Sequence, residues 1–254
     1  MKKLLALGNL IVFGGMIYLN YLGGSGGLYG NATGDVSGFY PTLFTPAGIT
    51  FSIWSIIYSF NLAFVIHQLV KAFRFPEKFN LKLNGGFLFV CLVNSGWVLA
   101  WHQLAVGASL ILMGLILGGL IYCYLQSRTT AASKEYYTEY VNFSIYLGWI
   151  SVASIANVAI YLTQIGVGYD GTMAAVLTLV TILVAVLLGL FFIYKQGNPW
   201  YAMVILWASI GIYLARNADM SAGADMVKIG AIAALVILFG GLVYKNVMAR
   251  TKSA

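Results

Sequence analysis

The sequence predicts an all-α membrane protein, a polytopic helical bundle of eight transmembrane helices with both termini in the cytoplasm. Three observations support this prediction. Of the 254 residues, 61% are hydrophobic and 8% are charged, and the mean hydropathy is +0.87, which is far more apolar than a water-soluble domain. Eight apolar stretches are long enough to cross about 30 Å of hydrocarbon. Lys and Arg are concentrated in alternate connections between those stretches.

The apolar stretches define the expected helices in order. They lie near residues 4–22, 48–70, 83–101, 106–126, 141–165, 172–194, 199–215 and 227–247. The first has the basic start and apolar run of a secretory signal but no small-x-small cleavage site, so we expect a retained span. The seventh is the shortest.

One connection, residues 23–47, is long and rich in Gly, Ser, Thr and Asn. A loop of this length is either a functional lid over a pocket or a disordered connector, and the sequence leaves both open. Pro46 near its end suits a helix start, because proline lacks the N–H that has no partner in a first turn.

The basic residues predict the orientation. Twelve of them fall on one side of the membrane: Lys2, Lys3, Lys71, Arg74, Lys78, Lys82, Arg128, Lys134, Lys195, Lys245, Arg250 and Lys252. The other side receives only Arg216 and Lys228, in the segment that holds Asp219 and Asp225, while the loops around Asp35 and Asp170 carry no base. Because basic loops stay inside, both termini are expected in the cytoplasm. The net charge of +7 therefore reflects orientation and not nucleic-acid binding, and we expect a prokaryotic cytoplasmic (inner) membrane protein.

Several function classes lack the residues that they need. No Asp, Glu, Lys or Arg falls in the middle of a span, which argues against a proton relay, an ion-coupled carrier, a voltage sensor and a retinal Schiff base. Cys91 and Cys123 are isolated, so we expect buried thiols and no metal site or disulfide. His67, His102 and Trp101 are expected at the membrane interface. Motifs for nucleophilic catalysis, phosphate binding and dinucleotide binding are absent, so no catalytic residue, metal or required cofactor is assigned.

The fifth stretch carries the best functional lead. Tyr146, Trp149, Ala153 and Asn157 follow one another at steps of three, four and four, which places them on one face of a helix. A buried amide needs a hydrogen-bonding partner, and Trp and Tyr offer flat walls with one polar group each. This face suits a pocket between helices better than contact with lipid.

Two further helices carry matching faces. Trp54 and Tyr58 share a face of the second helix, and Asn94 and Trp97 share a face of the third. At 1.5 Å per residue, Tyr58 and Trp149 lie roughly 15 and 18 Å below the outer surface, so the faces overlap in depth. If they converge, they enclose a cavity for an uncharged or amphipathic ligand in the outer half of the membrane. Alternatively, the amides of Asn94 and Asn157 simply join helix to helix.

The same three helices resemble the tryptophan-rich sensory protein family, also called TspO/MBR or translocator proteins. Residues 45–58, T-P-A-G-I-T-F-S-I-W-S-I-I-Y, are similar to the family's second-helix motif, although Thr45 and Gly48 depart from it. Residues 93–101 and 146–157 are similar to the third- and fifth-helix motifs, with Ile145 where the family has Pro. The matching positions are Pro46, Trp54, Tyr58, Asn94, Trp97, Tyr146, Trp149, Ala153 and Asn157.

The resemblance covers roughly residues 1–166, which are predicted to form a five-helix core, and leaves residues 167–254 as three further spans of unknown role. It implies a pocket, with the long loop as a lid, for porphyrins, haem-like tetrapyrroles, sterols or synthetic aromatic ligands. It also implies a homodimer, as is common in the family.

We therefore expect a membrane receptor or carrier for a hydrophobic planar ligand, with the lipid bilayer as its other partner. By the same resemblance, Trp54 and Trp149 look like the tryptophan pair that some bacterial members use in light-dependent porphyrin degradation. That activity is the enzymatic alternative. A structural or assembly subunit without a small ligand is the third.

Overall fold

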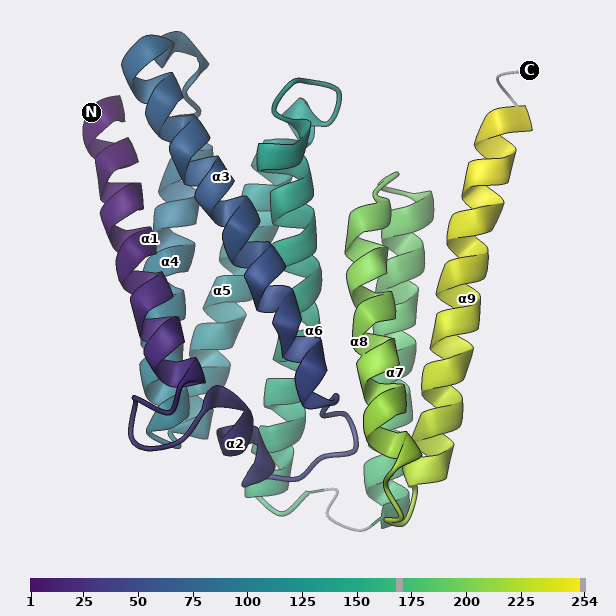
Figure 1. Ribbon diagram of the computed structural model, residues 1–254. Helices are drawn as coiled ribbons and strands as arrows, with labels where there is room; N and C mark the ends of the chain where they lie inside the picture. Colours follow the sequence, from purple (N-terminus) through teal and green to yellow (C-terminus); the bar gives the residue numbers. More distant parts are fainter. Residues whose placement is uncertain (168–170, 252–254) are drawn as a thin grey trace. The chain divides into compact units, whose positions relative to one another are not determined.

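The computed structural model describes residues 1–167 and 171–251, apart from the side chains of Ala249 and Arg250. Over these residues the chain is helical and contains no strand (Figure 1). The long helices are α1 (Lys2–Gly24), α3 (Ile53–Arg74), α4 (Leu81–His102), α5 (Val106–Ser127), α6 (Asn142–Gln164), α7 (Gly171–Tyr194), α8 (Pro199–Asn217) and α9 (Ala224–Thr251). Each predicted stretch thus lies on a helix.

Short helical segments join the long ones. They are α2 (Thr33–Gly38), the 3-10 turns η1 (Gly48–Ser52), η2 (Pro76–Lys78) and η3 (Arg128–Thr130), and the π-helix η4 (Tyr136–Val141). Both η1 and η4 run directly into the following α-helix. The turn η1 begins the second predicted span, whereas η4 precedes the fifth and shares only Val141 with it. Such π-turns are rare and are often found at functional sites.

Seven of the described helical segments are long and apolar enough to cross a membrane. They lie at Lys2–Gly24, Gly48–Arg74, Leu81–His102, Val106–Thr130, Tyr136–Gln164, Gly171–Tyr194 and Ala224–Met248. The chain is therefore an integral membrane protein with a lipid-facing surface. Helix α8, the predicted seventh span, is not among them. Its 19 residues include Ser209, Arg216 and Asn217, which lower its average hydropathy.

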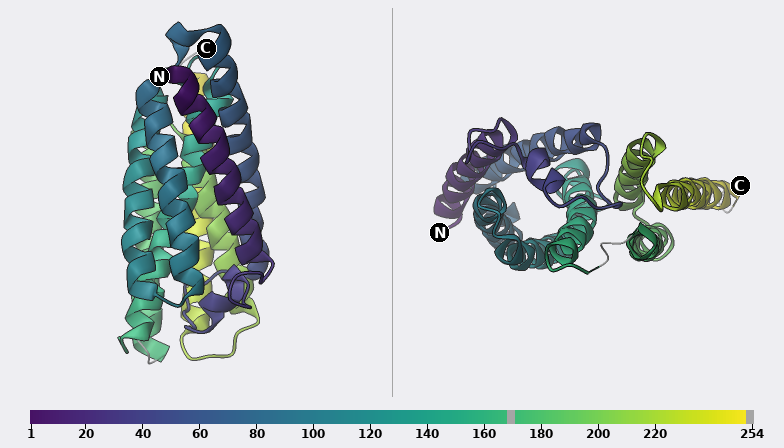
Figure 2. Two further views of the ribbon diagram at one scale, coloured as in Figure 1. Left: turned by 90° about the vertical axis from the view of Figure 1, so that its left-hand side faces the viewer. Right: turned by 90° about the horizontal axis from the view of Figure 1, so that it is seen from below.

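The chain divides into two compact units. The first comprises Met1–Phe39 and Ile53–Ile150, and the second comprises Tyr40–Ser52 and Ser151–Ala254, so the boundary passes through α6. The predicted division at residue 166 stays a prediction. Seen end-on, α1, α4, α5, the first turns of α6, and α3 surround the interior of the first unit (Figure 2).

Phenylalanine rings fill the middle of the first unit. Phe13, Phe64, Phe87 and Phe143 come from α1, α3, α4 and α6, and each is almost fully buried. Neighbouring ring centroids lie 4.9 Å (Phe64–Phe87), 5.1 Å (Phe64–Phe143), 6.0 Å (Phe13–Phe87) and 6.2 Å (Phe87–Phe143) apart. These are favourable tilted and edge-to-face distances. Dispersion contacts of this kind hold helices together where lipid provides no hydrophobic driving force.

In the second unit, α7 and α9 run parallel and α8 returns between their ends. The backbones of Gly171 and Gly223 adjoin at the helix starts, since a Cβ on Gly223 would lie 2.5 Å from the Gly171 oxygen. Near the other end the Tyr194 hydroxyl donates to the Gly241 carbonyl (3.3 Å). Midway, a Cβ on Gly189 would lie 2.6 Å from a Leu238 methyl carbon. Small residues thus allow the close helix approach that is common in membranes.

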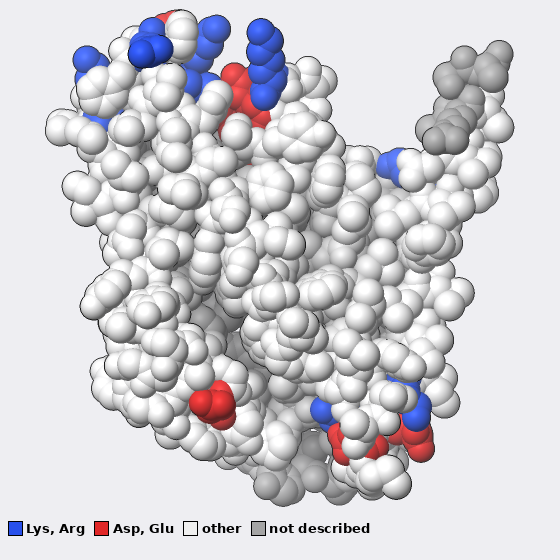
Figure 3. Space-filling model, viewed as in Figure 1, with Lys and Arg blue, Asp and Glu red and all other residues white. Residues whose placement is uncertain are grey.

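Charged side chains gather at helix ends in both units (Figure 3). In the first unit, the Lys2 ammonium donates to the Pro76 carbonyl (2.5 Å) and Lys71 pairs with Glu135 (3.3 Å), which places the predicted basic connections at one end. In the second unit, the Lys245 ammonium donates to the Ile193 carbonyl.

The acidic connection of the second unit lies at its opposite end. There Arg216 pairs with Asp219 (2.5 Å) and Lys228 pairs with Asp225 (2.6 Å). Within each unit the charges thus follow the predicted segregation. Asp170 and Lys252, and the side chain of Arg250, lie outside the described residues.

Candidate functional site

Four aromatic side chains of α3 and α6 meet inside the first unit, and we call Trp54, Tyr58, Tyr146 and Trp149 the ring cluster. Trp54 stacks on Tyr58 with ring centroids 5.3 Å apart. It meets Tyr146 and Trp149 edge-on, at 6.1 Å in each case. Tyr146 and Trp149 are buried, whereas Trp54 and Tyr58 are partly buried.

Helix geometry explains why these rings meet. Residues four apart on α3 and three apart on α6 lie on one face of each helix. The two helices run antiparallel, because Trp54 meets Trp149 near one end and the Gln68 amide donates to Glu139 (2.7 Å) near the other. The predicted convergence of the second and fifth helices on their aromatic faces is therefore present in the structure.

Asn94 joins three helices. Its side chain is fully buried, its oxygen accepts a hydrogen bond from the Asn20 amide (2.9 Å), and its nitrogen donates to the Tyr146 hydroxyl (3.4 Å). These contacts link α1, α4 and α6, which matches the helix-joining interpretation of this amide. They also hold Tyr146 in place within the ring cluster.

Trp97 lies in a second aromatic pair at the end of α4. Its ring stacks on Trp101 at 5.6 Å, and the Trp101 indole N–H donates to the Thr33 carbonyl (3.1 Å). Trp101 and His102 lie in the last turn of α4, where α2 and the end of α1 cover both side chains, and their position at the membrane interface stays a prediction. The His102 ring nitrogens lie 2.8 Å from the Val98 carbonyl and 3.2 Å from the Gly23 carbonyl.

The remaining predicted residues, Pro46, Ala153 and Asn157, belong to the second unit. Pro46 packs on α8, where a Cβ on Gly211 would lie 2.9 Å from the Pro46 Cβ. The Ala47 amide N–H donates to the Gly211 carbonyl (2.9 Å). Asn157 is buried and Ala153 is partly buried.

A buried polar network, which the sequence analysis did not predict, lies near the basic end of the first unit. Glu139 accepts hydrogen bonds from the Gln68 amide (2.7 Å) and the Lys71 ammonium (2.9 Å). Gln68 accepts from Asn84 (3.0 Å), whose own oxygen accepts from Asn9 (3.0 Å). The network ties α1, α3 and α4 to the π-helix η4. A buried ion pair of this kind is costly to desolvate, so its stability depends on these additional hydrogen bonds.

Two more buried amides adjoin the network in sequence. Asn61 on α3 and Asn142 at the start of α6 are fully buried, and both polar atoms of each side chain have no hydrogen-bond partner among the described residues. Buried amides without partners are uncommon and often mark a water or ligand position.

Two features explain why the sequence does not predict this network. Lys71 is one of the basic residues that predict the orientation, and Glu139 lies just outside the predicted span. The signal that could have found it is the spacing of Gln68 and Lys71, which places an amide and an ammonium on one helix face.

Comparison with known proteins identifies the family of the chain. A family model described as TSPO-like protein matches residues 5–244. The chain belongs to the TSPO-like protein family. The family match runs through α7, α8 and most of α9, for which the sequence motifs gave no counterpart. The chain matched no curated protein and no solved structure.

Proposed function

We propose that this TSPO-like protein is a membrane receptor or carrier that binds a hydrophobic, planar, tetrapyrrole-like ligand at the ring cluster. The observation that carries the proposal is the gathering of four aromatic rings from α3 and α6, with Trp54 and Tyr58 partly accessible. A planar ligand stacks on such rings, and its apolar body suits a site built within the membrane. Family membership supports a hydrophobic ligand.

The roles of the individual residues differ. Trp54 and Tyr58 offer ring faces to the ligand, whereas Trp149 supports Trp54 edge-on at 6.1 Å. Asn94 acts indirectly, because its two hydrogen bonds go to Asn20 and Tyr146. We therefore assign Asn94 and Trp149 to positioning, and Trp54 and Tyr58 to ligand contact.

Titration with protoporphyrin tests the proposal. Protein in lipid nanodiscs is titrated and the porphyrin absorption shift is recorded for wild type, Trp54→Leu/Trp149→Leu and the control Trp200→Leu, which changes an indole in the second unit. Loss of the Trp54 stacking contact and of its edge-on support by Trp149, about 0.5–1.5 kcal/mol each, predicts about a 5- to 150-fold weaker Kd. Equal Kd values for wild type and the double variant would refute the site.

Trp54 and Trp149, whose ring centroids lie 6.1 Å apart, are the pair for which the family resemblance implies a second candidate function, light-dependent breakdown of a bound porphyrin. Illuminating the loaded protein separates the two functions. A carrier leaves the porphyrin spectrum unchanged over time, whereas breakdown bleaches it in wild type and not in the double variant. A stable protein that binds no porphyrin would instead support the structural-subunit alternative.

We also propose that α8 crosses the membrane, which gives eight spans. Parallel helices α7 and α9 both have the length and apolarity of spans, so the chain must return across the membrane between Tyr194 and Ala224. Helix α8 has 19 residues, about 28 Å at 1.5 Å per residue, and fills that return. In this topology both termini lie in the cytoplasm. The proposed partners are the lipid bilayer of the cytoplasmic membrane and a second copy of the chain. Thiol labelling of the variants Ser221→Cys and Gln196→Cys tests the eight-span topology, because a membrane-spanning α8 puts these two positions on opposite sides of the membrane.

A further inference from the structure

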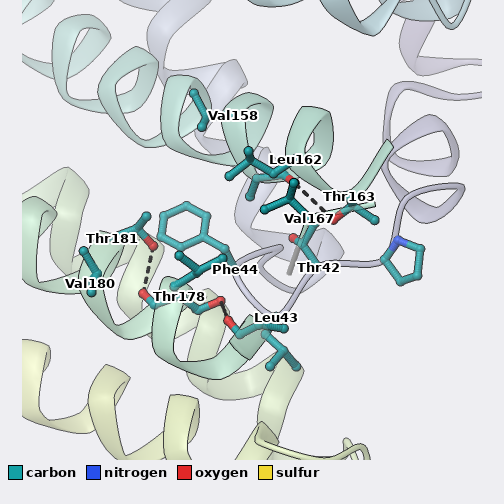
Figure 4. Close-up of a pocket in the computed structure, with 14 residues that line it drawn as sticks. Thr42, Leu43, Phe44, Val158, Leu162, Thr163, Val167, Thr178, Val180 and Thr181 are labelled. Atoms are coloured by element: carbon teal, nitrogen blue, oxygen red, sulfur yellow. Dashed lines mark hydrogen bonds between the residues drawn. The ribbon is translucent and has the colours of Figure 1, made fainter. Parts of the chain in front are cut away.

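A cavity of about 130 Å³ lies within the second unit (Figure 4). Three segments enclose it: the end of the long loop, the last turns of α6, and the first half of α7. The lining residues are Pro41, Thr42, Leu43, Phe44, Val158, Ala159, Leu162, Thr163, Val167, Ala174, Leu177, Thr178, Val180 and Thr181. The end of the long loop forms one wall of this cavity through the buried side chains of Leu43 and Phe44.

The lining selects an uncharged, largely apolar occupant. None of the lining side chains carries a charge. The hydroxyls of its three helical threonines already donate within their own helices, from Thr163 to the Ala159 carbonyl (3.1 Å), from Thr178 to the Ala174 carbonyl (2.7 Å) and from Thr181 to the Thr178 carbonyl (2.8 Å). The Thr42 hydroxyl, in the loop, is hydrogen-bonded to the Thr45 hydroxyl (2.8 Å). An apolar cavity without free donors does not hold ordered water.

The cavity lies at the depth of one leaflet. Val158 lies six residues before the end of α6 at Gln164, and Val180 lies nine residues after the start of α7 at Gly171. These offsets correspond to about 9 and 14 Å of helix, within the roughly 15 Å of half a hydrocarbon core. Val158 and Val180 are 42% and 52% exposed, so the cavity rim faces the surrounding medium, which at this depth is lipid.

We propose that this cavity binds one acyl chain of a bilayer phospholipid, held between α6 and α7 under Phe44. A cavity of about 150 Å³ holds a benzene ring, so the volume here suits a segment of about six carbons. Chain atoms filling the void gain dispersion contacts that an empty cavity lacks. None of the ring-cluster residues lines this cavity, so the lipid site does not rest on the proposed ligand site.

Photolabelling tests this site. The protein is reconstituted in nanodiscs of phosphatidylcholine with a diazirine midway along one acyl chain, irradiated, and mapped by mass spectrometry. Because Leu43 and Phe44 are 8% and 2% exposed, label on them reports a chain inside the cavity. Val236 on α9, at 67% exposure, reports ordinary lipid contact.

Wild type should carry label on Leu43 and Phe44 and also on Val236. The variant Ala159→Leu/Ala174→Leu fills the cavity and should reduce labelling of Leu43 and Phe44 about ten-fold, while the control Val184→Leu, at an exposed α7 position, leaves it unchanged. Label on Val236 alone in wild type would overturn the proposal without any variant. Labelling of Phe44 by a diazirine fatty alcohol but not by the phospholipid would overturn the phospholipid assignment. Porphyrin affinity should not change in the filled variant.

Discussion

Removing either charge of the buried Lys71–Glu139 pair should destabilise the first unit, and removing the Lys71 charge should cost more than removing the Glu139 charge. Lys71→Met leaves the Glu139 carboxylate, 2% exposed, with the Gln68 amide as a hydrogen-bond donor at 2.7 Å. Stranding one member of a buried ion pair costs about 3–5 kcal/mol. Glu139→Gln should cost less, about 1–3 kcal/mol, because Lys71 keeps Glu135 at 3.3 Å and glutamine still offers an acceptor.

Equilibrium unfolding in detergent measures both changes, and a 3 kcal/mol loss is more than a 100-fold change in the unfolding constant. The double variant Lys71→Met/Glu139→Met, which removes both charges, should lose less than Lys71→Met alone. Lys78→Met at an exposed position is the matched control. If Lys71→Met unfolds like Lys78→Met, or if Glu139→Gln is the more damaging change, the network does not hold the helices as argued.

Three further changes probe the packing and the charges. Gly211→Val should lower the Tm by several degrees, because the valine side chain would collide with Thr50 of η1, whereas Gly240→Val, with open space around it, should not. Equal Tm values for the two variants in thermal unfolding would contradict this packing. Asn94→Leu leaves Asn20 and the Tyr146 hydroxyl without Asn94 as a hydrogen-bond partner, so the free energy of unfolding should fall by about 1–3 kcal/mol. An unchanged free energy in chemical unfolding would count against this role of Asn94. The Ser133 hydroxyl is the main cause that lowers the pKa of Glu135 to about 2 from 4.5; the stabilisation is therefore present above pH 4.5 and lost as pH falls towards 2. Ser133→Ala should raise that pKa in an NMR titration, and an unchanged pKa would show that the backbone and Lys71 suffice.

The sequence alone determined where the long helices run. Each predicted stretch lies on a helix of the structure, because a membrane leaves the backbone no partner except its own helix and so makes hydrophobic length decisive. The spacing of Trp54 with Tyr58, and of Tyr146 with Trp149, also fixed which rings share a face.

Only the tertiary structure decided which faces meet. The ion pair of Lys71 with Glu139 joins residues 68 positions apart, and the chain turns that bring them together depend on packing. The same holds for Phe44, which reaches the cavity beside Thr178 from a loop far away in sequence. Helical periodicity records the direction of a side chain from its own axis, whereas its partner depends on the position and rotation of a second axis, which packing of all the neighbouring helices sets together.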